Sequence, residues 1–175
     1  MKIMNMKKGL IIMNNNDIKL ELLEEKDVEE LIPIMTRAFD KDAQIHLGEE
    51  KGGPEGYDNG DFIRKWGFDE KVTSYKILLD NKTIGAVMLW IDDISNENFL
   101  GNIFVDTSYQ NAGIGQRVWK MIEEKFPKTK VWRTETAGFS ARNHYFYVMK
   151  CGFKIVKIEN PMDKHGSNYI MEKYM

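Results

Sequence analysis

The residues of this chain best suited to chemistry form a glycine-rich turn, Gln110-Asn111-Ala112-Gly113-Ile114-Gly115. The turn follows the apolar run Ile103-Phe104-Val105, which is typical of a strand, and leads into a segment with helical spacing. The first turn of a helix presents unpaired backbone N–H groups and the positive end of the helix dipole. Glycines at 113 and 115 carry no Cβ atoms to keep a phosphate from that backbone. The turn is therefore predicted to bind a phosphate-containing ligand.

Two common nucleotide motifs do not fit this turn. A Walker A loop ends in Gly-Lys-Ser or Gly-Lys-Thr, whereas Gly115 is followed by Gln116-Arg117. The dinucleotide fingerprint needs a third glycine, where this chain has Val118, and a βαβ unit, where this chain has hairpin signals upstream. A third pattern, Gln or Arg followed by x-x-Gly-x-Gly, is matched by Gln110, Gly113 and Gly115. A module that binds nucleotide phosphates in some other way stays open as a rival interpretation.

The third pattern resembles the acyl-CoA signature of the GNAT superfamily of N-acetyltransferases. The resemblance runs from Asn102 through the strand end at Val105 and the acidic Asp106 to Gly115. It implies acetyl-CoA or coenzyme A as co-substrate, a primary amine of a small molecule or peptide as acceptor, and direct transfer without a covalent enzyme intermediate. The cofactor contacts that it implies are Ile103, Phe104, Val105, Gln110, Asn111, Ala112, Gly113, Ile114, Gly115, Gln116 and Asn143.

A second segment, Asn143-His144-Tyr145-Phe146-Tyr147 followed by Gly152-Phe153, resembles a later motif of the same family. Asn143 and Tyr147 are four residues apart and share a helix face, while Tyr145 points elsewhere. The resemblance makes Tyr147 the general acid and gives Asn143 a contact with the pantetheine or phosphate arm. Four residues separate Tyr147 from Gly152, where the common pattern has three, so a bulge or a longer helix end must absorb one. A packing tyrosine with a satisfied hydroxyl is the alternative for Tyr147.

The general base has the weakest signal in the sequence. Many relatives place a Glu on the strand before the signature, where this chain has Gly101-Asn102. Glu135, at the end of the next predicted strand, or a water chain to solvent is expected to take that role, although Glu135 also fits a solvated strand end. His46 is interpreted as a surface histidine in an irregular loop. The missing Glu keeps a non-catalytic acyl-CoA sensor open as the alternative function.

These segments need a framework, and the apolar spacing predicts an α+β fold with an α/β-like, three-layer arrangement. The order of the elements indicates a mixed sheet flanked by helices. This order resembles the GNAT fold, and the resemblance implies a mostly antiparallel, GNAT-type sheet. Asp27 is a plausible cap of the first helix, and Pro33 places the start of that helix closer to the proline. Asp80-Asn81-Lys82 is a hairpin signal. Strands are predicted at Ile18–Leu22, Tyr75–Leu79, Ile84–Ile91, Phe99–Val105, Lys130–Thr134, Phe153–Ile158 and Tyr169–Lys173, and helices at Val28–Phe39, Asp61–Trp66, Gly113–Phe126 and Ser140–Cys151.

A long irregular loop is predicted from Asp40 to Asp61, and in the family this region lines the acceptor side. The surplus of carboxylates between residues 40 and 70 favours a cationic amine, although solubilising charge explains it equally well. Tyr57, Phe62 and Trp66 wall the acceptor pocket or pack the short helix on the core. Nine carboxylates face four cations: Asp40, Asp42, Glu49, Glu50, Glu55, Asp58, Asp61, Asp69 and Glu70 against Lys41, Lys51, Arg64 and Lys65.

The bulk properties fit one soluble domain, predicted to span residues 17–175 after an extension at residues 1–16. The chain has 175 residues and a net charge of −2, with scattered Lys and Arg, so no nucleic-acid partner is expected. No apolar run is long enough to predict a membrane span, and no metal site is predicted. The single cysteine, Cys151, suits buried packing better than a nucleophile and predicts a cytoplasmic protein. A homodimer stays open.

Overall fold

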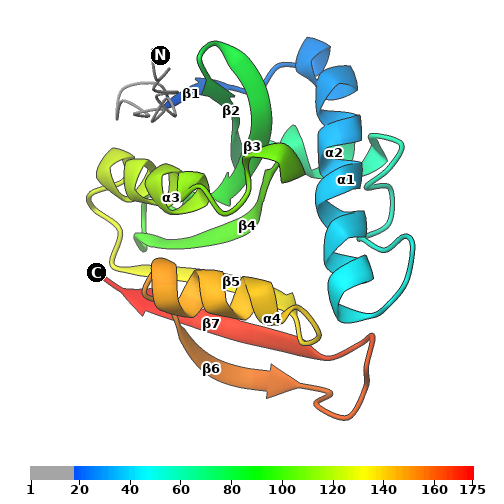
Figure 1. The fold of residues 1–175 in the computed structure, drawn as a ribbon. Coiled ribbons are helices and arrows are strands. Elements are labelled where there is room, and N and C mark those ends of the chain that lie inside the picture. The colour runs from blue at the N-terminus through cyan, green and yellow to red at the C-terminus, as the bar shows by residue number, and fades with distance from the viewer. Residues whose placement is uncertain (1–17) are drawn as a thin grey trace, which may run out of the picture.

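The computed structural model describes residues 18–175, and the predicted extension at residues 1–16 lies outside the described residues. Within the described part the chain forms one seven-stranded sheet in the order β1-β2-β3-β4-β5-β7-β6 (Figure 1). Neighbouring strands are antiparallel except β4 and β5, which are parallel, so the predicted mixed, mostly antiparallel sheet is confirmed. The strands are β1 (Ile18–Leu22), β2 (Val72–Leu79), β3 (Lys82–Trp90), β4 (Glu97–Val105), β5 (Val131–Ala137), β6 (Lys154–Glu159) and β7 (Asn168–Tyr174).

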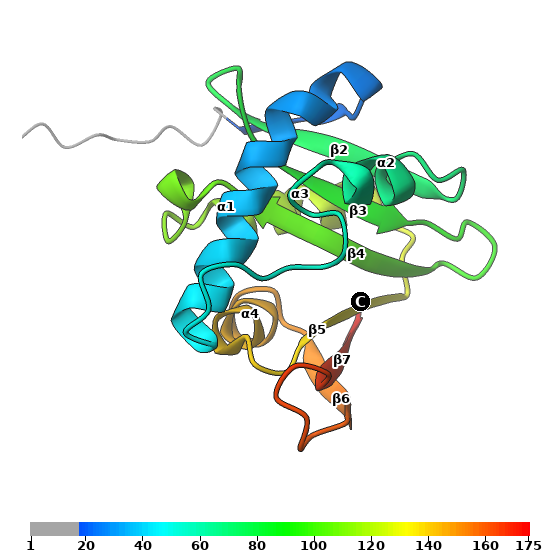
Figure 2. The ribbon, with the colours of Figure 1, turned by 90° about the vertical axis from the view of Figure 1, so that its right-hand side faces the viewer.

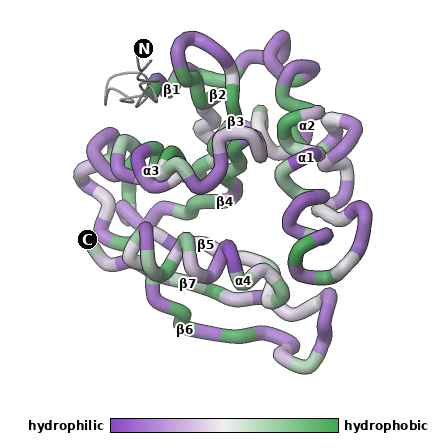
Figure 3. Tube along the Cα trace, in the orientation of Figure 1, coloured by the Kyte–Doolittle hydropathy of each residue, from purple (hydrophilic) through white to green (hydrophobic). Residues whose placement is uncertain are grey.

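Helices cover both faces of this sheet and give the predicted three layers (Figures 1 and 2). Successive residues of β3 point to opposite faces, so Val87 belongs to the core under α3 while Met88 belongs to the core under α1 and α2. Along α1 and α3, hydrophobic residues alternate with hydrophilic ones, as Figure 3 shows. The helical elements are η1 (Glu25–Asp27), α1 (Val28–His46), α2 (Asp61–Gly67), η2 (Thr107–Tyr109), α3 (Ile114–Lys125), α4 (Ala141–Tyr145) and η3 (Phe146–Lys150).

The first helix is longer than predicted at its C-terminal end. It continues to His46, so the irregular segment begins after residue 46 rather than at Asp40, and that prediction was wrong. The added turns are stabilised by packing, because Asp42 and Ala43 are buried, and the Asp42 carboxylate accepts a hydrogen bond from Ser140 near the start of α4. Sequence spacing does not reveal this contact, because Ser140 lies 98 residues further along the chain.

Helix α1 starts at Val28, where the apolar spacing placed it, and not closer to Pro33. The helix contains Pro33, although a proline inside a helix removes one backbone hydrogen bond and costs about 3 kcal/mol. Val28 and Leu31 are fully buried, and their burial favours the helix upstream of the proline. Asp27 precedes the helix but makes no side-chain cap to it; its carboxylate accepts from the backbone N–H of Glu24 and from Lys76 Nζ, both at 2.9 Å.

The β2–β3 hairpin is tighter than predicted. Lys82 pairs with Leu79 and so belongs to β3, which leaves Asp80 and Asn81 as a two-residue turn. Both turn residues have positive φ, 51° and 62°, as such a turn requires when it follows the twist of the strands.

The pairing between β4 and β5 is the feature that shapes the site. The strands pair only from Glu97 opposite Val131 to Leu100 opposite Thr134, and then they diverge. At the same point Gly101 is an extra residue in β4, since Leu100 pairs with Leu89 while Asn102 pairs with Met88. Such a bulge bends and twists its strand. A Cβ atom on residue 101 would lie 2.0 Å from the Trp90 ring, so this position has no room for a side chain.

Gly101→Ala is expected to destabilise the fold by roughly 1–3 kcal/mol, because the Trp90 ring must move out of a well-packed site. The measurement is the free energy of unfolding in urea for Gly101→Ala, Trp90→Leu and the double variant. Leucine removes the ring, so the double variant is expected to lose less stability than the two single losses together. Additive losses would contradict the contact as the cause.

Candidate active site

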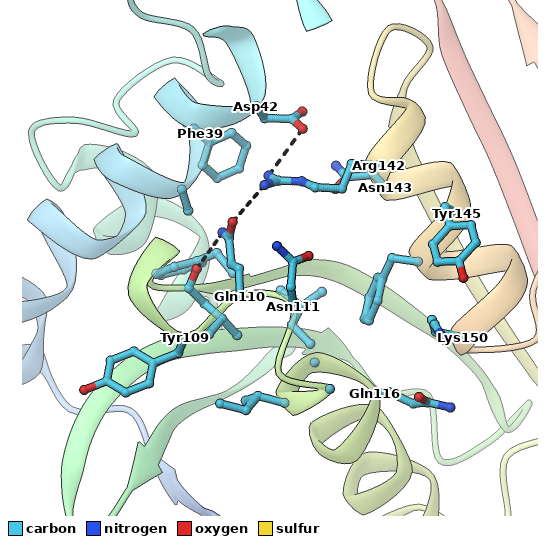
Figure 4. Close-up of a pocket in the computed structure, with 18 residues that line it drawn as sticks. Phe39, Asp42, Tyr109, Gln110, Asn111, Gln116, Arg142, Asn143, Tyr145 and Lys150 are labelled. Carbon is cyan, nitrogen blue, oxygen red and sulfur yellow. Dashed lines mark hydrogen bonds and ion pairs between the residues drawn. The ribbon is translucent and has the colours of Figure 1, made fainter. Parts of the chain in front are cut away.

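A cavity of about 380 Å³ lies at the divergence of β4 and β5, between the end of α1, the residue 110–115 turn and α4 (Figure 4). Ten of the eleven residues predicted to contact a cofactor line it; Ala112 does not. Neither Tyr147 nor Glu135 is among the lining residues. The structure therefore brings the predicted binding segments together, and their contact with a cofactor stays a prediction.

The residue 110–115 turn, called the glycine turn below, joins β4 to α3. Gly113 has a φ of +74°, a left-handed conformation that side chains rarely adopt, and a Cβ atom there would meet nothing within 4 Å. Its open side is the cavity that it lines. The first backbone N–H groups of α3, from Ile114 onward, have no partner within the helix. An anion in the cavity would therefore meet several N–H donors and the positive end of the α3 dipole.

Asp106, at the end of β4, serves the turn structurally. Its carboxylate accepts from the backbone N–H of Ser108 at 3.1 Å and pairs with Arg37 Nη2 of α1 at 2.5 Å. The carboxylate is thus engaged on two sides and holds the turn against α1.

The far edge of β4 offers a second set of backbone groups. Beyond Leu100 the strand no longer pairs with β5, so this edge between residues 101 and 105 borders the cavity without a strand partner. Two side chains close the ends of the open stretch: Thr134 Oγ1 donates to the Leu100 carbonyl at 2.8 Å, and Gln110 Nε2 donates to the Val105 carbonyl at 3.0 Å. An extended ligand with amide groups can pair with the edge between them.

A chain of polar contacts crosses the cavity wall, as the dashed lines of Figure 4 show. Gln110 Oε1 accepts from Arg142 Nη1 at 2.8 Å, and Arg142 Nη2 lies 3.3 Å from Asp42 Oδ1. Sequence reasoning assigned Asp42 to an acidic loop and did not single out Arg142. The only sequence signal near Arg142 was the adjacent Asn143, because no spacing rule relates residues of α1 to residues of α4.

Helix α4 changes its hydrogen-bonding pattern in mid-course. Five residues, Phe146–Lys150, form a π-helical turn in which the Cys151 N–H donates to the Phe146 carbonyl at 3.1 Å. This turn absorbs the extra residue before Gly152, as the spacing predicted. Tyr145 points away from the buried Tyr147, as expected; it is 56% exposed and lines the cavity. Asn143 also lines the cavity and donates from Nδ2 to Thr136 Oγ1 at 3.2 Å.

Tyr147 is buried beside the cavity rather than exposed in it. Its ring packs against those of Phe146 and Phe153, with centroids 5.2 and 5.8 Å apart. Its hydroxyl faces Thr134, the last residue of β5 that pairs with β4. Burial raises the pKa of Tyr147 well above its usual value, and the Thr134 hydrogen bond opposes this only in part. The hydroxyl is therefore protonated at neutral pH and lies where the strands part.

Glu135 lies at the same level of the sheet but on the opposite face. Thr134 and Thr136 face α4, through Tyr147 and Asn143, so the residue between them points toward the face that α1 and α2 cover. We call this the α1/α2 face. The Glu135 carboxylate is exposed and accepts from Asn168 Nδ2 at 3.1 Å.

His46 is not the surface histidine of an irregular loop that was predicted. It is the last residue of α1, and its side chain is only 15% exposed. Its Nε2 lies 3.4 Å from the Arg142 backbone nitrogen and 3.5 Å from Asp42 Oδ1. The ring joins the end of α1 to the start of α4.

Several carboxylates of the acidic region have structural partners. Asp40 accepts from the Tyr57 hydroxyl at 2.6 Å, and burial together with this carboxylate raises the pKa of Tyr57 to about 12. Asp42 pairs with Arg142, and Glu49 lies 3.6 Å from His165. Tyr57 is a core residue, so it packs the segment onto α1 instead of walling a pocket.

Cys151 is buried, as predicted, and burial raises the pKa of its thiol to about 12. Thiolate is then scarce at neutral pH, which argues against a nucleophile at this position. Residues 18–175 contain no group of three or more His, Cys, Asp or Glu side chains able to hold a metal ion. None of the helices described is long and apolar enough to cross a membrane.

Known proteins are similar to this chain in sequence or in fold. The sequence model of the acetyltransferase (GNAT) family matches residues 33–153. The uncharacterised protein YrkN of Bacillus subtilis (strain 168) is 36% identical over 160 residues, which cover 91% of this chain and 84% of YrkN. The PaiA N-acetyltransferase of Thermoplasma acidophilum, solved with coenzyme A, superposes with a TM-score of 0.68 at 21% identity, covering 90% of this chain and 99% of that one. The ribosomal-protein-S18-alanine N-acetyltransferase of Escherichia coli gives 0.67 at 17% identity, covering 90% and 93%.

Gly113→Ala is expected to lower coenzyme A affinity about tenfold or more, because its methyl group enters the space that faces the cavity. The left-handed backbone also costs about 1 kcal/mol of stability. Isothermal titration with coenzyme A and urea unfolding measure the two effects separately.

Gly48→Ala is the matched control for that variant. Gly48 has a φ of +73° and equally open surroundings, but it does not line the cavity. The control should lose similar stability and keep its affinity. Equal affinity losses in both variants would place the phosphate site elsewhere.

Proposed function

The chain belongs to the acetyltransferase (GNAT) family, and on that basis we propose that it transfers an acetyl group from acetyl-CoA directly to a primary amine of a small molecule or peptide. One observation carries the proposal: the glycine turn, the open edge of β4 and the first turn of α3 line a single cavity. Both chemical parts of coenzyme A, its phosphates and its amide-bearing arm, find matching groups there.

The fit of the cofactor rests on backbone groups. The N–H groups of the glycine turn and of α3 suit the pyrophosphate. The open edge of β4 between the Val105 and Leu100 carbonyls suits the amides of the pantetheine arm. In this arrangement the thioester lies near Gly101, where the strands part, and a backbone N–H of β4 stabilises the oxyanion.

Tyr147 is the proposed general acid. Its hydroxyl stays protonated and faces Thr134 at the point of divergence, so it can donate to the departing thiolate. A thiol has a pKa near 8.5, so its thiolate already leaves readily and needs only a weak acid. Tyr147 does not line the cavity, and a small movement of the π-helical turn would expose it.

Glu135 is the proposed general base. A lysine-like amine has a pKa near 10.4 and must lose a proton before it attacks. Glu135 projects from the α1/α2 face, on which the acceptor is proposed to bind, on the opposite side from Tyr147. It can therefore accept that proton directly or through water. Gly101 and Asn102 leave no carboxylate on β4 at this level, which makes Glu135 the nearest acidic candidate in β4 or β5.

The charge of the 40–70 region supports a cationic acceptor. Asp40, Asp42 and Glu49 have structural partners, while Arg64 pairs with Glu25 and Glu29 outside the region. The remaining carboxylates still outnumber the remaining cations. A negative potential at the acceptor side would raise the local concentration of an ammonium substrate and speed its capture.

The experiment for the function is a panel of amines, including polyamines and peptide amines, with acetyl-CoA, in which free thiol release is measured. Amine-dependent release supports the transferase. Tight coenzyme A binding without release for any amine favours the rival function, a non-catalytic acyl-CoA sensor. Stabilisation by ATP but not by coenzyme A would exclude both.

Tyr147→Phe is expected to lower kcat by about tenfold or more while coenzyme A affinity is kept, since general acids contribute roughly 10²–10⁴-fold and a thiolate needs little help. Thiol release across pH measures the loss. Tyr145→Phe, on the same helix and facing the cavity, is the control and should keep its kcat. The opposite pattern in the two variants would assign the acid to Tyr145.

Glu135→Gln is expected to lower turnover at neutral pH by roughly one to two orders of magnitude. The deficit should shrink as pH rises, because more of the amine is already deprotonated in solution. The measurement is kcat/KM for the amine from pH 6 to 10, with Glu159→Gln of β6 as the control. A deficit independent of pH would exclude Glu135 as the base.

A further inference from the structure

Arg142 is the feature that the proposed function leaves unexplained. It is a cation that lines the cavity, and a cation beside a phosphate site suggests a phosphate ligand. Its contacts point to another role. We infer that Arg142 is a positioning residue, which holds Gln110 and through it the glycine turn, and that Asp42 keeps it from binding phosphate. The inference rests on the proposed acyl-CoA site.

The charge of Arg142 is already matched within the protein. Its Nη2 lies 3.3 Å from Asp42 Oδ1, and the Asp42 side chain is only 11% exposed. Ser140 Oγ, fully buried, donates to the same oxygen at 3.0 Å. A carboxylate this deeply buried needs a partner, and losing one charge of a buried pair is far costlier than losing a surface pair. If Arg142 moved from Asp42 to a phosphate, the Asp42 carboxylate would be left buried without a cationic partner, which would destabilise the protein.

The other terminal nitrogen of the guanidinium, Nη1, orients the side-chain amide of Gln110. Arg142 Nη1 donates to Gln110 Oε1, so the Gln110 amide must turn its Nε2 toward the Val105 carbonyl, where it donates at 3.0 Å. A neutral amide can accept from an arginine through its oxygen while it donates to a carbonyl through its nitrogen. Gln110 thereby ties the start of the glycine turn to the end of β4.

The consequence is a fixed direction for the phosphate donors. Gln110 opens the turn whose following residues supply the cavity-facing N–H groups, so its anchorage sets where they point. Preorganised donors bind an anion without first losing conformational freedom. Phosphate charge is then met by backbone dipoles and by Lys150, which lines the cavity from the π-helical turn. Arg142 contributes geometry rather than charge.

The experiment is a double-mutant cycle on coenzyme A binding with Arg142→Met, Gln110→Leu and the combination, measured by isothermal titration. Leucine and methionine keep the approximate size of the side chains. A positioning role predicts that each single variant loses about tenfold in affinity and that the combination loses little more than either one. A phosphate ligand predicts losses that multiply, because Gln110→Leu would leave the arginine–phosphate contact intact.

Two further readouts separate the roles. Asp42→Asn frees Arg142: positioning predicts weaker coenzyme A binding, whereas a phosphate ligand predicts equal or tighter binding. The salt dependence of binding should be unchanged in Arg142→Met if the residue is positional and shallower if it contacts phosphate.

Urea unfolding of each variant tests whether the whole fold is destabilised. If Asp42→Asn does not fold, the double-mutant cycle of Arg142→Met and Gln110→Leu decides between the two roles of Arg142. Wild-type protein that fails to bind coenzyme A overturns the proposed function. Binding with multiplying losses overturns only the role of Arg142.

Discussion

The short parallel pairing of β4 with β5 is the constraint on which the site depends. Four residue pairs hold the two halves of the sheet together, and the bulge at Gly101 then turns β4 away from its neighbour. The cavity, the open backbone edge and the glycine turn all lie downstream of that point. A regular sheet would pair the same groups with one another and leave no room between them. The packing of Trp90 against Gly101 is what allows the bulge to sit there.

Alternation along one strand places the proposed acid and base on opposite sides of the reacting centre. Thr134 meets Tyr147 on the face of α4, and Glu135, the next residue, projects from the α1/α2 face. In the proposed reaction, proton delivery to the thiolate and proton removal from the amine would take place on opposite faces of the sheet. Their surroundings differ in the same sense, since Tyr147 is buried and kept protonated whereas Glu135 is exposed to solvent.

Local sequence patterns predicted the strands, the glycine turn and the extra residue before Gly152, because each depends on neighbours in the chain. The sequence did not predict features that depend on tertiary contacts. The last turns of α1 are stabilised by Ser140 and Arg142, and the same contacts bury Asp42 and His46. The side-chain directions of Tyr145 and Tyr147 follow from the π-helical turn, whose position within the helix no spacing rule fixes. Residue spacing predicts which face of a helix a side chain lies on only while the helix stays regular.

That π-helical turn also bears on how such a site can change over generations. An inserted residue in an ordinary helix would rotate everything after it, yet here Phe153 lies in the core and Asn143 lines the cavity. The insertion is absorbed between them, so only the aromatic side chains within the turn are reassigned. A single codon gained or lost at this point would change which aromatic ring of this segment faces the cavity, while Asn143 and Phe153 stayed in place.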